Sequence, residues 1–264
     1  MKGHKIRLLA ILLLFGILLC GCNVSNYIYT EDSLKKVAEK SLKKKYGEEF
    51  VVHSAWAKNA EVFYADCSPK NNSEIVFRAD VYKSGKGVYA DGYVQGVVAN
   101  SINEFLEPDI KLLYENCYTR VSPPSYYNVY QFENPKNVTI SEYLEKNELD
   151  YVGYNIFVLD TECDKLNIDN EYNLFSQKIL KDIRERRIPS MAVTVYFVDD
   201  RMYEYTKAYY STHTTYDSDF DQQLEICEKM WWGYPENNIN ISREQFHELR
   251  TVIQENLSKM KEVQ

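Results

Sequence analysis

The pattern of apolar and polar residues predicts an amphipathic helix followed by an antiparallel sheet in the first half of the chain. Between Glu31 and Tyr46, apolar residues recur every three or four positions and lysines occupy the other side, as in a helix that buries one face. Strand-like runs follow at 50–57, 61–67, 74–82 and 88–94. The turn-forming residues 84–87 join the last two runs, so we expect these two to form a hairpin.

The middle of the chain loses this regularity. Residues 97–106 have the helical period, and Pro108 either ends that helix or opens a second one that runs to Cys117. The stretch 118–137 contains the pair Pro123-Pro124 and several tyrosines without a clear period. We interpret 118–137 as a linker between two small halves, 31–117 and 138–264.

The second half restarts with a capping box, in which Thr139 and Glu142 open a short helix that ends near Lys146. Strands are predicted at 151–159, 191–198 and 202–210, with the last two paired as a hairpin over Asp199-Asp200. Helices are predicted at 170–187, 219–232 and from Ser242 to about 260. The chain is therefore expected to be an α+β protein, with helices packed on one face of antiparallel sheets in each half.

The N-terminus combines a basic segment with a short apolar run. Lys2, Lys5 and Arg7 precede the apolar segment Leu8–Leu19, which is 12 residues long. At about 1.5 Å per residue, such a helix covers only about 18 Å of a ~30 Å hydrocarbon core. This is the layout of a signal peptide, and the chain that follows is expected to be exported.

The end of this segment, Leu19-Cys20-Gly21-Cys22, resembles the processing site of bacterial lipoproteins. The resemblance implies that residues 1–21 are removed and that Cys22 carries a diacylglycerol with fatty acyl chains such as palmitate. Residues 22–30 would then form a short tether to the extracytoplasmic face of the cell membrane. Cys20 fits less well as the modified residue. The processing site has a small residue before the modified cysteine, and bulky Leu19 would take that place, whereas Gly21 precedes Cys22. An uncleaved N-terminal anchor and an ordinary secretory peptide are the alternatives.

Charge argues against two classes of partner. The chain has a net charge of −8, and its first 22 residues hold three basic and no acidic side chains. The exported part therefore carries 28 basic against 39 acidic residues, a net charge of −11. An acidic domain of this kind is poorly suited to nucleic acid or to anionic headgroups, so its attachment to the membrane must come from the lipid.

Four cysteines remain in the exported part: Cys67, Cys117, Cys163 and Cys227. The pairing with the shortest loops joins Cys67 to Cys117 and Cys163 to Cys227, and each bond would stabilise the fold by about 4 kcal/mol. The alternative is four buried free thiols. The chain has no C-x-x-C, so a redox motif or a zinc knuckle is not expected.

An acidic cluster and two aromatic clusters are candidate binding sites. Asp217, Asp219, Asp221 and Glu228 match several positions of a calcium loop, but Gln222 stands where that loop needs glycine. The simpler interpretation is an acidic helix start, so no metal is expected. The segment Trp231–Pro235 could offer an aromatic platform for a sugar or a peptide, although aromatic pairs at a helix end more often pack in the core. A tyrosine stripe at 203, 205, 209 and 210 is expected to form a sheet wall under a helix.

No catalytic constellation is visible. His53, His213 and His247 are far apart, and the motifs of zinc hydrolases, serine hydrolases and nucleotide-binding loops are absent. The sequence therefore favours a non-catalytic, lipid-anchored binding module without a cofactor, which binds a protein or another ligand of the cell envelope, an envelope protein being one candidate partner. The alternatives are a cell-surface hydrolase without a recognisable motif and a calcium- or sugar-binding lipoprotein.

Overall fold

A computed structural model describes residues 29–122, 132–147, 152–161, 167–188, 190–214, 218–225, 227–234 and 242–262. The contacts divide the chain into residues 1–30 and one compact unit, residues 31–264. The signal segment lies outside the described residues, and so do Cys20 and Cys22. Within the described ranges, no helix combines the length and the apolar character needed to cross a bilayer.

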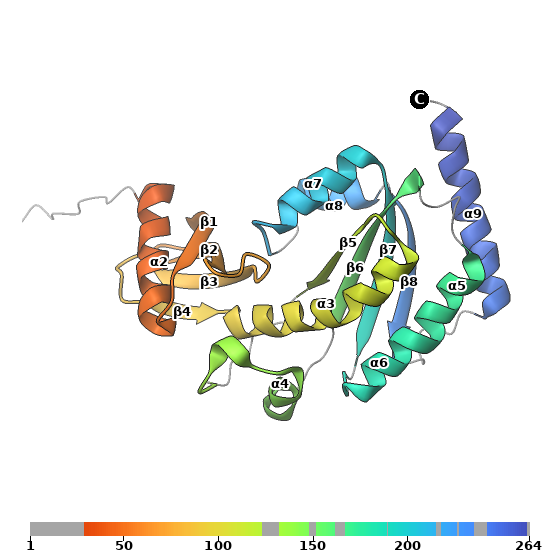
Figure 1. Ribbon diagram of the computed structural model, residues 1–264. Helices are drawn as coiled ribbons and strands as arrows, with labels where there is room; N and C mark the ends of the chain where they lie inside the picture. Colours follow the sequence, from red (N-terminus) through yellow and green to blue (C-terminus); the bar gives the residue numbers. More distant parts are fainter. Residues whose placement is uncertain are drawn as a thin grey trace, which may run out of the picture. The chain divides into compact units, whose positions relative to one another are not determined.

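The first half consists of one helix and a four-stranded antiparallel sheet (Figure 1). Its elements are α2 (Glu31–Tyr46), β1 (Phe50–Ala57), β2 (Val62–Pro69), β3 (Phe77–Tyr82) and β4 (Val88–Asp91). The strands pair in sequence order, which confirms the predicted meander and hairpin. The predicted runs at 74–82 and 88–94 are shorter than expected, because strand pairing begins at Phe77 and ends at Asp91.

Helix α2 packs on one face of this first sheet. It buries Leu34, Ala38 and Leu42 against alternate residues of the strands, among them Phe63 and Phe77. Gly47 ends the helix with a φ of 69°, and its N–H donates to the carbonyl of Lys43 at 2.8 Å. A residue with a side chain is strained at this backbone angle, so glycine is needed here.

Helix α3 (Tyr93–Leu113) leads from the first sheet to the second (Figure 1). Its first turns bury Tyr93 and Val97 in the core of the first half, whereas Leu106 and Ile110 are buried in the core of the second. Pro108 lies inside the helix, so the prediction that it ends or opens a helix is wrong. Burial on both sides of Pro108 outweighs the cost of about 3 kcal/mol that an internal proline imposes.

The second sheet contains four strands in the order β5 (Cys117–Ser122), β6 (Val152–Leu159), β7 (Met191–Val198) and β8 (Glu228–Tyr234). The middle pair, β6 and β7, is parallel, and the outer pairs are antiparallel. The sheet is therefore mixed, whereas an antiparallel sheet was expected. Residues 118–122, interpreted as part of a linker, form a core strand, because pairing with β6 buries Val121 and Thr119. Residues 123–131 lie outside the described part of the chain.

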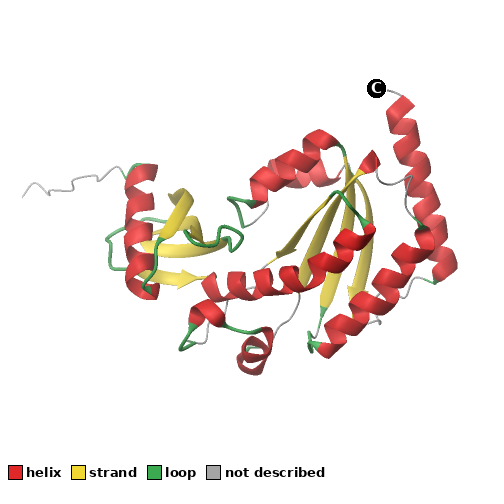
Figure 2. Ribbon diagram, in the orientation of Figure 1, coloured by secondary structure: helices red, strands yellow, loops and turns green. Residues whose placement is uncertain are grey.

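Helices cover both faces of the second sheet (Figure 2), not one face as expected. They are a 3-10 turn at Pro135–Asn137, α4 (Ile140–Lys146), α5 (Ile168–Asn173), a π-helical stretch at Leu174–Ile179, α6 (Leu180–Glu185), α7 (Asp200–Tyr210), α8 (Ser218–Glu225) and α9 (Arg243–Glu262). The helical run from Ile168 to Glu185 connects β6 to β7, and a parallel pair requires a crossover of this length. On the opposite face, α7 and α8 pack on Phe157 and Val198.

Two segments have a different structure from the one that their sequence predicted. The segment 202–210 is helix and not strand, because the Asp199 carboxylate caps it by accepting from the N–H of Met202 at 2.7 Å. The predicted helix 219–232 ends at Glu225, and Glu228 begins the strand that pairs with β7. The two predicted caps, Thr139 with Glu142 and Ser242 with Gln245, are confirmed as reciprocal hydrogen bonds.

Candidate functional site

The face of the first sheet that points away from α2 carries a set of polar and aromatic side chains. Strand alternation places them there, because their neighbours in sequence fill the core under α2. Cross-strand pairing sets Trp56 opposite Tyr64, Tyr64 opposite Asp80, and Asp66 opposite Arg78. We call this surface the polar face. Its members are His53, Trp56, Lys58, Tyr64, Asp66, Ser68, Arg78, Asp80, Tyr82 and Tyr89.

At one end of the polar face, a buried carboxylate joins the two halves of the chain. Asp66 accepts a hydrogen bond from Arg78 Nε at 3.3 Å and from Thr214 Oγ1 at 2.9 Å. Thr214 follows α7, so the second half reaches this face. The other oxygen, Oδ2, is buried without a hydrogen-bond partner among the described residues. Arg78 offsets the charge of Asp66, since a buried carboxylate is stable only when it is paired.

His53 and Ser68 form a second contact beside Asp66. An irregularity in the pairing of β1 with β2, between Val52 and Ser54, brings His53 Nε2 to 3.0 Å from Ser68 Oγ. Burial lowers the pKa of His53, and the charge of Asp66 opposes this effect. A serine paired with a histidine can act as a nucleophile. However, Ser68 is only 1 % exposed, so its hydroxyl is closed to a substrate in this conformation.

The other end of the polar face is open to solvent and rich in rings. The Arg78 guanidinium carbon lies 4.8 Å from the Trp56 ring centroid and 5.2 Å from that of Tyr64. Lys58 Nζ lies 4.9 Å from the Tyr64 centroid and 2.6 Å from an oxygen of Asp80. Each such cation–π contact contributes about 0.5–1 kcal/mol at an exposed site. The rings are therefore held in fixed positions although Trp56 is 38 % exposed.

A second ring pair extends this open end across the sheet. Tyr82 on β3 and Tyr89 on β4 contact each other edge to face, with centroids 5.6 Å apart. Tyr89 is exposed. The open end of the polar face thus presents aromatic rings from all four strands, interleaved with a guanidinium and an ammonium group.

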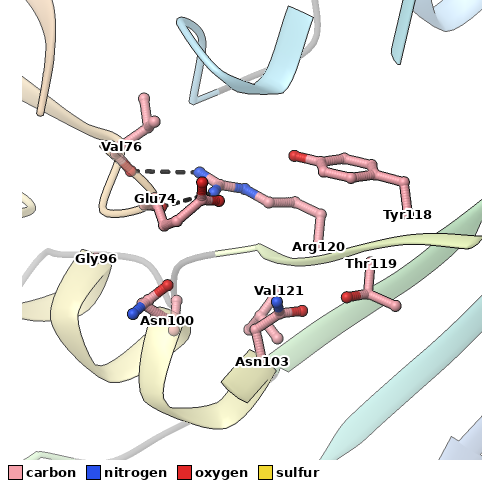
Figure 3. Close-up of a pocket in the computed structure, with 10 residues that line it drawn as sticks. Glu74, Val76, Gly96, Asn100, Asn103, Tyr118, Thr119, Arg120 and Val121 are labelled. Carbon is pink, nitrogen blue, oxygen red and sulfur yellow. Dashed lines mark hydrogen bonds between the residues drawn. The ribbon is translucent and has the colours of Figure 1, made fainter. Parts of the chain in front are cut away.

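A small recess lies where the two halves meet (Figure 3). Arg120 on β5 donates to the carbonyl of Glu74 at 3.1 Å and to that of Val76 at 3.5 Å, in the segment before β3. Helix α3 closes the recess. Gly96 lets this helix lie close to the segment before β3, because a Cβ at position 96 would be only 3.2 Å from Ile75 Cγ2. The cavity volume of the recess is about 10 Å³, which is enough for about one water molecule. We therefore regard this recess as a junction between the halves and not as a ligand site.

The cysteines that the sequence singled out are free thiols where the structure describes them. Cys67 and Cys117 are buried free thiols, which agrees with the alternative of unpaired cysteines, and the possible bond between them is not formed. Each belongs to the core of a different half. Burial raises the pKa of Cys117 to about 12 and that of half-buried Cys227 to about 11. Cys163 lies outside the described residues.

The acidic candidates are not brought together as a calcium loop. Asp219 and Asp221 lie in α8, whose backbone is helical, and Asp217 lies outside the described residues. Glu228 opens β8 and accepts a hydrogen bond from Asn256 Nδ2 at 3.0 Å. Among the described residues, no group of three histidine, cysteine or acidic side chains could hold a metal ion.

The aromatic candidates are also placed differently from the prediction. Residues 231–234 belong to β8, and Pro235 lies outside the described residues. The tyrosines at 203, 205, 209 and 210 lie on α7, where Tyr209 stacks on Phe220 of α8 at 4.3 Å. These rings therefore form a helix contact and not a sheet wall. Sequence reasoning missed the polar face, for which the only local signal was the period of two in the strands.

Comparison with known proteins adds a fold relationship. No protein-family profile matches the chain, and no curated protein matches it. The crystal structure of a DUF5037 family protein from Ruminococcus gnavus is similar, with a TM-score of 0.63 and 18 % sequence identity. The similarity covers 82 % of this chain and 98 % of that chain. At this identity it shows a shared fold and nothing about activity.

Proposed function

We propose that the chain is a membrane-anchored, exported bacterial lipoprotein whose folded unit is a non-catalytic binding module for an envelope protein. The open end of the polar face is its contact surface. The observation that carries the proposal is the packing of half-buried Arg78 against the rings of Trp56, which is exposed, and of Tyr64.

Two physical features support a protein partner. Aromatic residues and arginine are the side chains most enriched in protein interfaces and in their energetic hot spots. The contacts on this face also restrict Arg78 and Lys58 before any partner arrives. Binding then costs less side-chain entropy, which is about 0.5–1.5 kcal/mol for each long side chain that is immobilised.

The lipid anchor is supported by Leu19-Cys20-Gly21-Cys22 and by the acidic character of the rest of the chain. Metabolic labelling with palmitate tests it. Label should enter the wild type and the Cys20→Ala variant and be lost in Cys22→Ala. Equal labelling of wild type and Cys22→Ala would overturn the anchor.

The contact surface is tested by crosslinking in intact cells. A photo-reactive phenylalanine at position 89 should form a discrete adduct with an envelope protein, and Trp56→Ser should abolish this adduct. The matched control is position 112 on α3, since Leu112 is apolar and 84 % exposed but lies away from the polar face. Adducts that are equally frequent at 89 and 112, or that persist in Trp56→Ser, would contradict the proposal.

A further inference from the structure

A groove outside the polar face has the size of a small-molecule site. It lies between α3, the segment 136–141 that leads into α4, and the end of α6. This open groove has a volume of about 400 Å³, within the range of roughly 300–1,000 Å³ that is usual for ligand pockets. It is thus far larger than the recess at the junction of the halves.

The groove has an apolar part and a polar part. Val97, Val138 and Ile140 provide aliphatic side chains that are otherwise packed in the core. Ser101 and Asn137 add a hydroxyl and an amide to the same lining. An apolar lining with a few convergent polar groups is the usual composition of a ligand site.

Two cations complete the lining, Lys136 from the 3-10 turn and Arg186 from the C-terminal end of α6. The Arg186 guanidinium carbon lies 4.1 Å from the ring centroid of Phe105. This contact restricts the side chain and leaves its positive charge in place. A guanidinium held in this way is well suited to an oxyanion, because its planar fork matches carboxylate and phosphate oxygens.

Acidic residues near the groove only partly neutralise these cations. No acid is among the described residues that line the groove. Glu48 lies 3.5 Å from Lys136 Nζ, and its other oxygen accepts a hydrogen bond from Tyr93 at 2.7 Å. Glu142 is bound by the N–H and hydroxyl of Thr139 in the cap of α4. The lining of the groove therefore holds two cations and no acid among the described residues, in a protein that is acidic as a whole.

We propose that this groove binds a small amphipathic anion. Its carboxylate or phosphate group contacts Arg186 and Lys136, and its short apolar chain contacts Val97, Val138 and Ile140. The site is separate from the protein-binding surface proposed above and does not depend on it.

Calorimetry on the full lipidated protein in phosphatidylcholine nanodiscs tests this site with defined probes. Hexanoate and hexyl phosphate present the two head groups on molecules that each contain six carbon atoms. Hexanamide is the uncharged control, and acetate lacks the apolar chain. We expect saturable binding of at least one six-carbon anion, about tenfold weaker binding of hexanamide, and weaker binding of acetate than of hexanoate.

Substitutions locate the binding on the molecule. Arg186→Gln should weaken binding of the anion about tenfold. Lys181→Gln, which removes the same charge from an exposed position of the same helix, should leave it unchanged. The proposal is overturned if neither six-carbon anion binds, if hexanamide binds as tightly, or if the two variants behave alike while circular dichroism shows both to be folded.

Discussion

Arg250 on α9 donates from Nε to Oε2 of Glu171 on α5 at 2.7 Å, and neither side chain is exposed to solvent. Tyr114 donates to the other oxygen of Glu171, and the Arg250 guanidinium carbon lies 4.6 Å from the centroid of Phe197. This pair connects the last helix of the chain to the crossover helix and to the residue after α3.

Glu171→Gln should therefore lower the free energy of unfolding by about 3–5 kcal/mol, because it removes the carboxylate that pairs with the buried Arg250 charge. Urea denaturation measures this change. Glu185→Gln, at an exposed end of α6, is the control and should change stability by less than about 0.5 kcal/mol. The double substitution Glu171→Leu with Arg250→Met should recover much of the loss, since it removes both charges. A double variant as unstable as Glu171→Gln would contradict a charge effect.

The half-buried histidine of the polar face, His53, predicts a dependence of stability on pH. Burial lowers the pKa of His53 in the folded state below its ordinary value of 6.5. Folding therefore favours the neutral ring, so this contribution to stability is present above about pH 6.5 and is lost as the pH falls through the folded-state pKa.

The measurement compares urea denaturation of wild type and His53→Gln at several pH values. The wild type should lose more stability than the variant between about pH 7.5 and 5.5. Above about pH 7.5 the difference between the two should stay constant. A constant difference over the whole range would show that His53 titrates as it does in the unfolded chain.

Thiol alkylation distinguishes free thiols at Cys67 and Cys117 from a disulfide bond between them. Desolvation raises the pKa of the Cys67 and Cys117 thiols, so both should react very slowly with iodoacetamide at neutral pH in the folded protein. In denaturant, without reductant, both should be alkylated at ordinary rates. Peptide mass spectrometry reads both experiments, and a peptide pair linked through Cys67 and Cys117 would contradict the free thiols.

Substitution of Asp199 tests whether its side chain caps α7, the segment that the sequence predicted as a strand. Asp199→Ala should destabilise the protein by about 1 kcal/mol, because the N–H of Met202 loses its acceptor. Asp200→Ala, one residue inside the helix, keeps that hydrogen bond and should cost less. If both substitutions had the same effect in urea denaturation, Asp199 would not act as the cap.

Local features of the sequence were sufficient for much of the fold. The capping pairs Thr139–Glu142 and Ser242–Gln245, the amphipathic helix at 31–46 and the hairpin turn at 84–87 were all predicted from residues within a few positions of one another. Such features are encoded locally, because caps, turns and one-sided helices depend on neighbouring residues.

The wrong prediction of a strand at 202–210 arose because two periods fit the same residues. Met202, Thr206, Tyr209 and Tyr210 are the buried residues of α7 and follow a helical spacing. The tyrosines nevertheless favoured a strand, because aromatic residues are enriched in strands. Strands β6 and β8 occupy the two edges of β7, so the sheet has no place for 202–210 beside β7. The cap at Asp199 then starts a helix.

By itself, the sequence determined the α+β class and most of the helices and strands, and it pointed to the expected lipid anchor at Cys22. Only the tertiary structure brought together His53, Ser68 and Asp66 with Thr214, which is 148 positions from Asp66. The same holds for Glu171 and Arg250, 79 positions apart. Contacts across such distances leave no periodic trace in the chain, because they depend on how sheets and helices pack and not on the spacing of neighbouring residues.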